Sequence, residues 1–251
     1  MMDHIALLNL YREWGVDEAL VSLCTNHLEN VKQTVHKSPT KQNFSSLSSS
    51  QKDLSIQLQN ATNLNEICEI IQSSKASPLH DTAMHSVLPK GNPEGKYFII
   101  GEVPDHEEDR SGYVFAGRCE AWIKQLLSDI EIPFDQCLRI PLIPWRPPGG
   151  RPPSDQELQN CLPFLYRILE IYNPELIITM GVRPTRVLTG SSAPIGRLRG
   201  RWQKITLPEQ KKTLLLFPMR HPSQLDISVK ARQETWHDLL LIRKFINDNT
   251  S

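Results

Sequence analysis

The sequence predicts an α/β fold, a three-layer α/β/α sandwich built around a small parallel sheet of about four strands. Four short segments rich in apolar and β-branched residues alternate with longer segments of helical periodicity. Each short segment is almost continuously apolar, which is typical of parallel strands that helices cover on both faces. These segments are residues 96–102, 137–144, 176–181 and 213–219.

Helices are expected before, between and after these strands. Ser154 and Glu157 have the spacing of a capping box, which predicts a helix over 154–172, and Pro163 should kink or interrupt it. Asn63 is a suitable N-cap for a helix over 64–73. Apolar residues at helical spacing predict the remaining helices, over 120–130, 184–188 and 229–247.

The chain divides into three segments of different composition. Residues 1–34 carry apolar residues mostly at helical spacing, so we expect an N-terminal helical extension there. Residues 35–62 are rich in Ser, Gln, Lys and Asn, which predicts a flexible polar linker. Residues 63–251 should form the α/β/α domain.

Charge and cysteine content exclude several classes of protein. The 28 basic and 28 acidic residues balance, so a nucleic-acid partner must be held by a local basic patch. No apolar run approaches the roughly 18–20 residues of a membrane helix, and no signal-peptide pattern opens the chain, so we expect a cytoplasmic protein without membrane contact. The five cysteines form no CxxC pair, which argues against a disulfide framework or a zinc ribbon.

Chemically active side chains follow the predicted strands, at the edge where open parallel sheets bind ligands. Glu102 lies in a Gly-x-x-Pro loop, where a carboxylate can orient a water or stabilise a cationic sugar. His221 follows the last strand and can donate a hydrogen bond. Asp105 is a second catalytic candidate, since closely spaced carboxylates hold protons more tightly and can tune a base.

Each candidate also has a plainer structural explanation. Glu102 can simply cap a helix, Asp105 can belong to a solvated acidic loop, and Phe115 can be a core side chain. The arginines of the second half can form a scattered solvated surface. These alternatives stay open on the sequence alone.

Six segments in a fixed order resemble the uracil-DNA glycosylase superfamily. They are GEVPDHEEDRSGYVFAG, WRPPGGRPP, CLPFL, ITMGVRPTRVL, RGRW and HPSQL, spanning roughly residues 77–246. The resemblance is closest to the bacterial and archaeal (family 4 type) subgroup that typically carries an iron–sulfur cluster. It implies the family's fold and a DNA-repair glycosylase that hydrolyses the N-glycosidic bond of uracil or another deaminated base.

The resemblance also implies roles for individual residues. Glu102 would help a water attack the sugar, and His221 would stabilise the negative charge that develops on the departing base. Phe115 would stack on the extruded base, which such an enzyme must take out of the DNA stack. Gly101, Phe115 and position 141 would line the base site.

The expected partner is DNA with a damaged or deaminated base, bound by a monomer. Ser223, Gln224 and Leu225 would form a loop that presses into the DNA, with Leu225 or a neighbour as the wedge. Basic residues expected at the same edge to contact phosphate are Arg146, Arg197, Arg199, Arg201 and Arg220.

The sequence departs from the family pattern at the cluster ligands. The four cysteines of the cluster-bearing relatives correspond to Ser77, His80, Trp145 and Cys161. One thiolate and one histidine cannot hold a typical four-iron cluster. We therefore expect no metal or other cofactor, and packing that includes Trp145 in its place.

A second departure concerns the base. Pro141 stands where relatives that excise uracil have an asparagine that reads the base edge. Losing that contact removes about 1 to 3 kcal/mol of discrimination. Arg139, Gln224 or the backbone would have to replace it. The alternative is a catalytically weak or silent DNA-binding relative, whereas the missing GxGxxG and P-loop signatures disfavour an unrelated nucleotide-binding enzyme.

Overall fold

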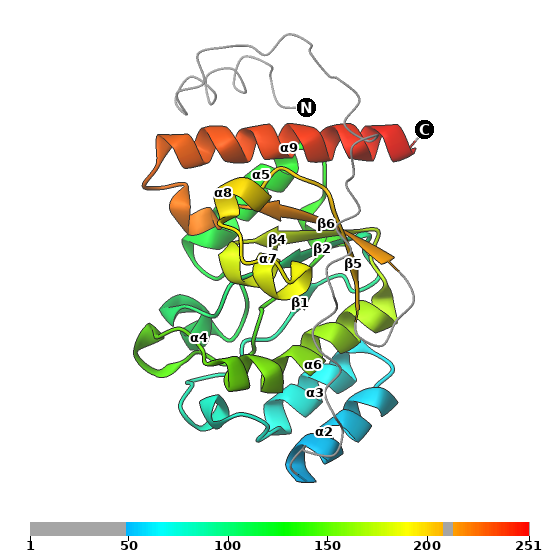
Figure 1. The fold of residues 1–251 in the computed structure, drawn as a ribbon, viewed down its shortest axis with the longest axis vertical. Coiled ribbons are helices and arrows are strands. Elements are labelled where there is room, and N and C mark those ends of the chain that lie inside the picture. The colour runs from blue at the N-terminus through cyan, green and yellow to red at the C-terminus, as the bar shows by residue number, and fades with distance from the viewer. Residues whose placement is uncertain (1–48, 208–212, 251) are drawn as a thin grey trace.

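A six-stranded sheet lies at the centre of the molecule (Figure 1). The computed structural model describes residues 49–207 and 213–250. The strand order is β1-β3-β2-β4-β6-β5. The strands are β1 (Lys90–Gly91), β2 (Tyr97–Ile100), β3 (Cys137–Ile140), β4 (Leu176–Met180), β5 (Gln203–Thr206) and β6 (Thr213–Met219).

The four predicted strands form the parallel centre of this sheet. β3, β2, β4 and β6 pair in parallel, and the register aligns Ile100 of β2 with Ile140 of β3 and with Thr179 of β4. The predicted strand number was too small, because β1 and β5 add antiparallel edges. Both lack an apolar run: β1 has two residues, and only Ile205 is buried in β5.

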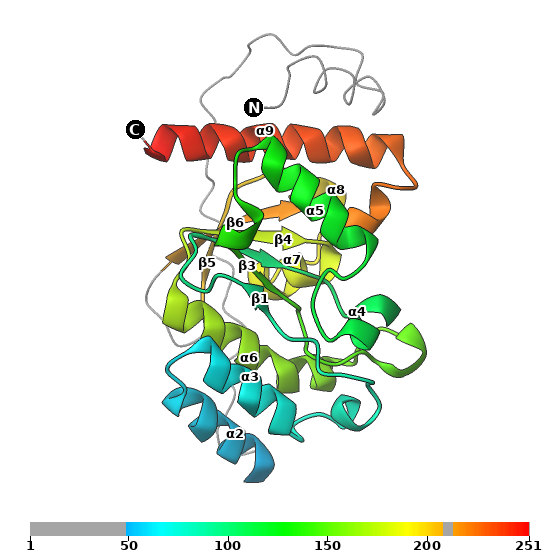
Figure 2. The same ribbon diagram turned by 180° about the vertical axis from the view of Figure 1, so that it is seen from behind.

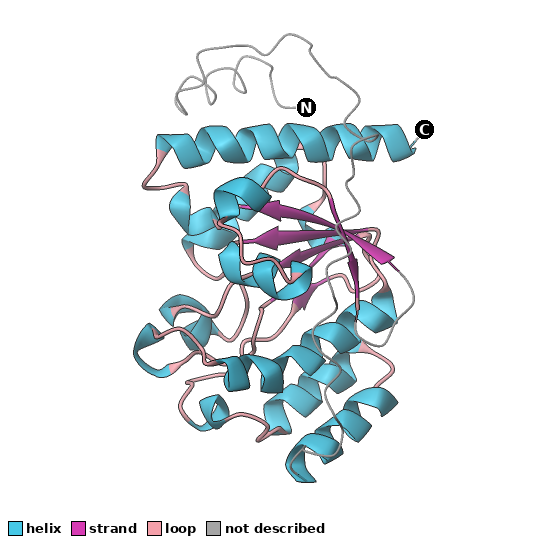
Figure 3. Cartoon of the chain, in the orientation of Figure 1, coloured by secondary structure: helices cyan, strands magenta, loops and turns pink. Residues whose placement is uncertain are grey.

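Helices cover both faces of the sheet, which confirms the predicted three-layer architecture (Figures 1 and 3). α3, α6 and α7 lie on one face, and α5 and α9 lie on the other (Figure 2). The α-helices are α2 (Ser49–Asn60), α3 (Leu64–Ser73), α4 (His106–Ser111), α5 (Arg118–Asp129), α6 (Asp155–Tyr172), α7 (Val182–Thr189), α8 (Ile195–Leu198) and α9 (Val229–Thr250). The short 3₁₀ turns are η3 (Pro78–Asp81), η4 (Phe134–Gln136), η5 (Pro148–Gly150) and η6 (Pro222–Gln224).

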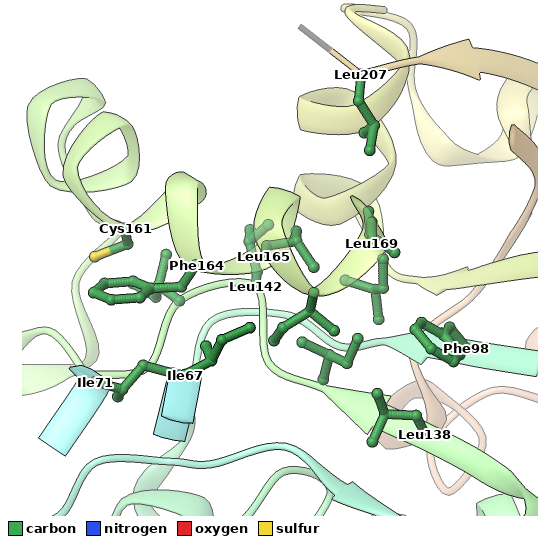
Figure 4. Packing of buried hydrophobic residues seen from close by; sticks show 14 of the residues in the cluster. Ile67, Ile71, Phe98, Leu138, Leu142, Cys161, Phe164, Leu165, Leu169 and Leu207 are labelled. Atoms are coloured by element: carbon green, nitrogen blue, oxygen red, sulfur yellow. The ribbon is translucent and has the colours of Figure 1, made fainter. Parts of the chain in front are cut away.

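Alternating strand residues supply the two cores. Phe98 of β2 and Leu138 of β3 point to the face where Ile67 of α3 and Phe164 and Leu169 of α6 pack (Figure 4). The residues between them on the strands, such as Ile99, face α5 and α9 instead. A side-chain period of two therefore divides each central strand between two apolar layers.

The two predicted helix caps are present, but a proline inside α6 does not have the effect expected of it. The side chain of Asn63 caps α3, and Ser154 and Glu157 form a reciprocal capping box at the start of α6. Pro163 was expected to kink or interrupt the helix, and the interruption is wrong, because α6 runs through the proline as one helix. Packing of Phe164, Leu165 and Ile168 on the sheet outweighs the single backbone hydrogen bond that a proline removes.

The predicted linker is wrong for its last part, because α2 is a helix packed on the domain. Leu54 and Leu58, four residues apart, are buried in the core that includes α6. The guanidinium of Arg167 donates to the carbonyls of Gln59 and Ala61 at the end of α2. Two leucines at i and i+4 in a polar segment are too weak a sequence signal to reveal this contact.

Two predictions lie outside the described residues: the helical extension over 1–34 and the linker over 35–48. Within the part of the chain that the structure describes, no helix has the length and apolar character needed to cross a membrane.

Candidate active site

The predicted catalytic residues meet where the parallel strands end. Gly101 follows β2, Gly181 follows β4, and His221 lies just beyond β6. Backbone hydrogen bonds hold these ends level: Gly101 N–H donates to Ile140 at 2.9 Å, and Gly181 N–H donates to Met219 at 3.0 Å. Residues that follow three different strands thus lie together at one edge of the sheet.

The Glu102 carboxylate rests against the backbone at the start of α7. Its Oε1 accepts a hydrogen bond from the Arg183 N–H at 3.1 Å, and its Oε2 lies 3.4 Å from Arg183 Nη1. A Cβ at Gly181 would lie 2.3 Å from Oε1, and Gly181 has a φ of +120°. Only glycine at position 181 leaves room for the carboxylate in this place.

His221 presents one ring nitrogen as a donor. Its Nδ1 accepts the Ser223 N–H at 3.3 Å, so the neutral ring carries its proton on Nε2. Burial lowers the pKa of His221, although the charges of Glu102 and Asp105 oppose that effect. The ring is therefore favoured in its neutral form, with Nε2–H available as a hydrogen-bond donor.

The Phe115 ring packs between Gly101 and His221. Its centroid lies 5.9 Å from that of the His221 ring, with an interplanar angle of 25°. A Cβ at Gly101 would lie 3.0 Å from Phe115 Cζ, so the ring contacts the backbone there. The side chain is only 1% exposed, and its φ of +59° lies in the left-handed region.

Asp105 is the N-cap of α4. Its Oδ1 accepts the N–H groups of Glu107 and Glu108, both at 2.9 Å. Asp105 therefore caps a helix, whereas a solvated acidic loop was the plainer explanation expected for it. It also acts on the ring of His221 through its charge.

Pro141 and the groups that were expected to replace its missing amide lie in different places. Pro141 borders a small apolar hollow with Ile71 of α3 and Leu165 of α6. Arg139 is buried in β3, and its guanidinium donates to the Phe134 carbonyl at 2.9 Å, in the turn that precedes the strand. Gln224 lies in η6 beside His221, and its side-chain oxygen accepts from Arg220 at 3.2 Å.

Three of the five arginines predicted to bind DNA are engaged in ion pairs. Arg199 contacts buried Asp238, and Arg220 contacts Glu234; both acids belong to α9. Arg146 lies 3.9 Å from the Asp109 carboxylate. The other two, Arg197 and Arg201, are exposed.

The loop after His221 buries Leu225 and exposes a different aliphatic residue. Leu225 is 1% exposed and belongs to the core beneath α9, whereas Ile227 is 83% exposed. Asp226 anchors the loop by accepting the indole N–H of Trp122 at 3.0 Å. Ser228 caps the first turn of α9 through the Ala231 N–H at 3.1 Å. Ile227 is therefore held outward between two anchored residues.

The positions that correspond to cluster ligands do not fit an iron–sulfur cluster. Trp145 is fully buried there, with its indole N–H donating to Ser86 Oγ at 2.9 Å and its ring edge-on to His80. Burial raises the pKa of the Cys161 thiol to about 12, and Ser77 hydrogen-bonds to it. The described residues contain no group of three or more side chains that could hold a metal ion.

Four residues at this edge were not among the sequence-predicted site residues. Gly181 and Arg183 hold Glu102, Glu108 is a buried acid beside Phe115, and Ile227 projects from the loop. The glycine after an apolar strand was the available signal for Gly181. The other three depend on burial or contacts between distant segments, which the sequence does not show.

Comparison with known proteins adds independent information. Residues 88–240 match the family model of the uracil DNA glycosylase superfamily. The chain is 26% identical over 186 residues to the type-4 uracil-DNA glycosylase of Sulfurisphaera tokodaii, covering 72% of this chain and 84% of that protein. It is 29% identical over 183 residues to the type-4 uracil-DNA glycosylase of Thermotoga maritima, covering 72% and 93%. A third, from Saccharolobus solfataricus, is 28% identical over 166 residues, covering 64% and 76%.

The matched segment holds all three strand ends that form the site, and it spans more than half of the 251 residues. The resemblance seen in the sequence motifs is thereby confirmed. This chain belongs to the uracil DNA glycosylase superfamily.

Proposed function

We propose that this protein is a DNA-repair glycosylase that hydrolyses the N-glycosidic bond of uracil or another deaminated base in DNA. The observation that carries the proposal is the meeting of Glu102, Phe115 and His221 at one edge of the sheet. Relatives across most of the chain are named uracil-DNA glycosylases. A base, a sugar and a water each have a suitable partner at this edge.

Glu102 is the group that acts on the sugar side of the bond. Its carboxylate is partly exposed, and the Arg183 amide and the Gly181 backbone fix its direction. A fixed carboxylate can accept a hydrogen bond from the attacking water and stabilise positive charge on the sugar.

His221 and Phe115 act on the base. As the bond breaks, negative charge moves onto the base, and Nε2–H of a neutral His221 can donate to its carbonyl oxygen. Phe115 supplies a flat face for stacking. Because His221 covers the ring in the described structure, the base reaches Phe115 only when these two rings separate.

The alternative function is a catalytically weak or silent DNA-binding protein. The observation that favours it is Pro141, which faces an apolar hollow and has no amide with which to read a base. Gln224 stands beside His221 and is the remaining side chain of the three expected substitutes. Turnover decides between the two functions.

The first prediction concerns release of the base. Purified protein incubated with single- or double-stranded DNA containing uracil, hypoxanthine or xanthine should leave abasic sites, which alkali converts to strand breaks. Glu102→Gln and His221→Ala should each slow release by at least about 100-fold, as expected for loss of a general base or charge stabiliser. DNA that is bound without release of any base would support the silent relative. Full release by both variants would refute the assigned site.

The second prediction tests how Glu102 is held. Gly181→Ala places a methyl group 2.3 Å from Glu102 Oε1, so the carboxylate must move. A displacement of this size should slow base release by roughly 10²-fold. Gly196→Ala is the control, because no atom lies within 4 Å of its added Cβ. Wild-type rates in both variants would show that the place of Glu102 is unimportant.

The third prediction assigns the DNA wedge to Ile227 in place of Leu225. An exposed aliphatic side chain can enter the gap left by an extruded base, whereas a core residue cannot. Ile227→Ala should slow release from duplex several-fold and affect single-stranded DNA less, because only the duplex must be opened. Ile56→Ala, at an exposed position of α2, is the matched control. Equal losses on both substrates would contradict the assignment.

The fourth prediction is that the protein folds and acts without an iron–sulfur cluster. Packing of Trp145 against His80 and Phe164 supports this proposal, because it fills the place of the ligands. Protein purified without oxygen should be colourless and free of iron by elemental analysis. Stoichiometric iron would overturn it.

The monomeric state and the cytoplasmic location expected from the sequence remain predictions. Sedimentation of the purified protein would test the first, and fractionation of cells that express it would test the second.

A further inference from the structure

Glu108 is a buried acid outside the proposed catalytic pair. It lies in α4 and is 8% exposed. Its Oε2 accepts the Asp105 N–H at 2.9 Å, and its Oε1 accepts the Phe115 N–H at 2.5 Å. One carboxylate thus joins the beginning and the end of the loop that carries the aromatic side chain of the site.

The bond to Phe115 is the informative one. The Asp105 bond completes a capping box and suffices to explain a glutamate at this position of a helix. Phe115 lies beyond the helix, and its amide adds nothing to the cap. Its φ of +59° is costly for a residue with a Cβ and persists only where surrounding contacts hold it.

The backbone position of Phe115 sets where its ring lies. The ring contacts the Gly101 backbone on one side and stacks with His221 on the other. A change in the left-handed backbone would swing the ring out of this gap. Glu108 therefore acts on the base site through Phe115. Among the described contacts, it has none with His221.

The electrostatics show that this arrangement is retained against a cost. Burial raises the pKa of Glu108 to about 7, although the two backbone hydrogen bonds lower it. Asp105 repels the charge, and the neighbouring group from α5 is the thiol of Cys119. A buried carboxyl group with a raised pKa and two fixed backbone partners is typical of a functional site.

We propose that Glu108 is a positioning residue that holds the Phe115 backbone so that the ring keeps its place against Gly101, and so sets where the extruded base stacks once the His221 ring has moved aside. The inference rests on the proposed function, because stacking of a base has meaning only in a protein that extrudes one.

A kinetic experiment tests the proposal with Glu108→Gln, which keeps the shape but cannot accept both N–H groups. Single-turnover release of uracil should fall by roughly 10- to 100-fold. Affinity for DNA with a non-cleavable uracil analogue should change less than twofold. Phe115→Leu should lose activity as well, and the double variant should be no slower than Phe115→Leu alone. Additive losses would overturn the proposal. Glu107→Gln, at an exposed position of the same helix, is the control.

A second readout needs no turnover. The Phe115 ring current displaces the ring-proton resonances of His221, which NMR of histidine-labelled protein can follow. In Glu108→Gln these resonances should move toward their positions in Phe115→Leu, while Glu107→Gln leaves them in place. If glutamine at position 108 prevents folding, Glu108→Asp, too short to span both amides, should produce the same shift. Unmoved resonances in the folded variant would refute the role of Glu108. If the wild-type protein releases no base, the proposed glycosylase function is refuted. The NMR comparison would still decide whether Glu108 positions the Phe115 ring.

Discussion

The contact of the Glu102 carboxylate with the backbone of Gly181 and the amide of Arg183 is the interaction on which the site depends. It joins the end of β2 to the beginning of α7. It exists only because β2 and β4 run parallel and in a register that brings their carboxyl ends level. The two apolar layers hold that register, since a slip of one residue would exchange every side chain between them. The position of the Glu102 carboxylate at the sheet edge thus depends on the packing of the two apolar layers on the sheet.

Ion pairs with α9 shape the rest of this edge. Asp238 and Glu234 hold Arg199 and Arg220, the first of these pairs almost without exposure. Pairs of this kind orient the chain more than they stabilise it, because desolvation offsets most of their attraction. Burial raises the pKa of Asp238 to about 7 even though Arg199 lowers it. In the proposed function the positive charge that contacts DNA must be local, because the net charge of the chain is zero.

The fold was readable from the sequence where strong patterns existed. Continuous apolar runs identified β2, β3, β4 and β6, and the Ser154 capping box identified the start of α6. The sequence did not predict β1, β5 and α2, because each buries few side chains and forms only against a neighbouring element. The position of Glu102 and His221 at the sheet edge was predictable, because each lies two residues beyond a strand. The exposure of Ile227, the burial of Leu225 and the bond from Glu108 to Phe115 depend on tertiary contacts that no local pattern encodes.

In the proposed function, Glu102 and His221 break a glycosidic bond in DNA. It is tested most directly by a single-turnover time course with enzyme in excess over a uracil-containing duplex, in which mass spectrometry identifies the liberated base. We expect free uracil at a rate that Glu102→Gln lowers by at least about 100-fold while DNA binding persists. Tight binding of the duplex by wild-type protein, with no free uracil and no abasic site, would contradict it.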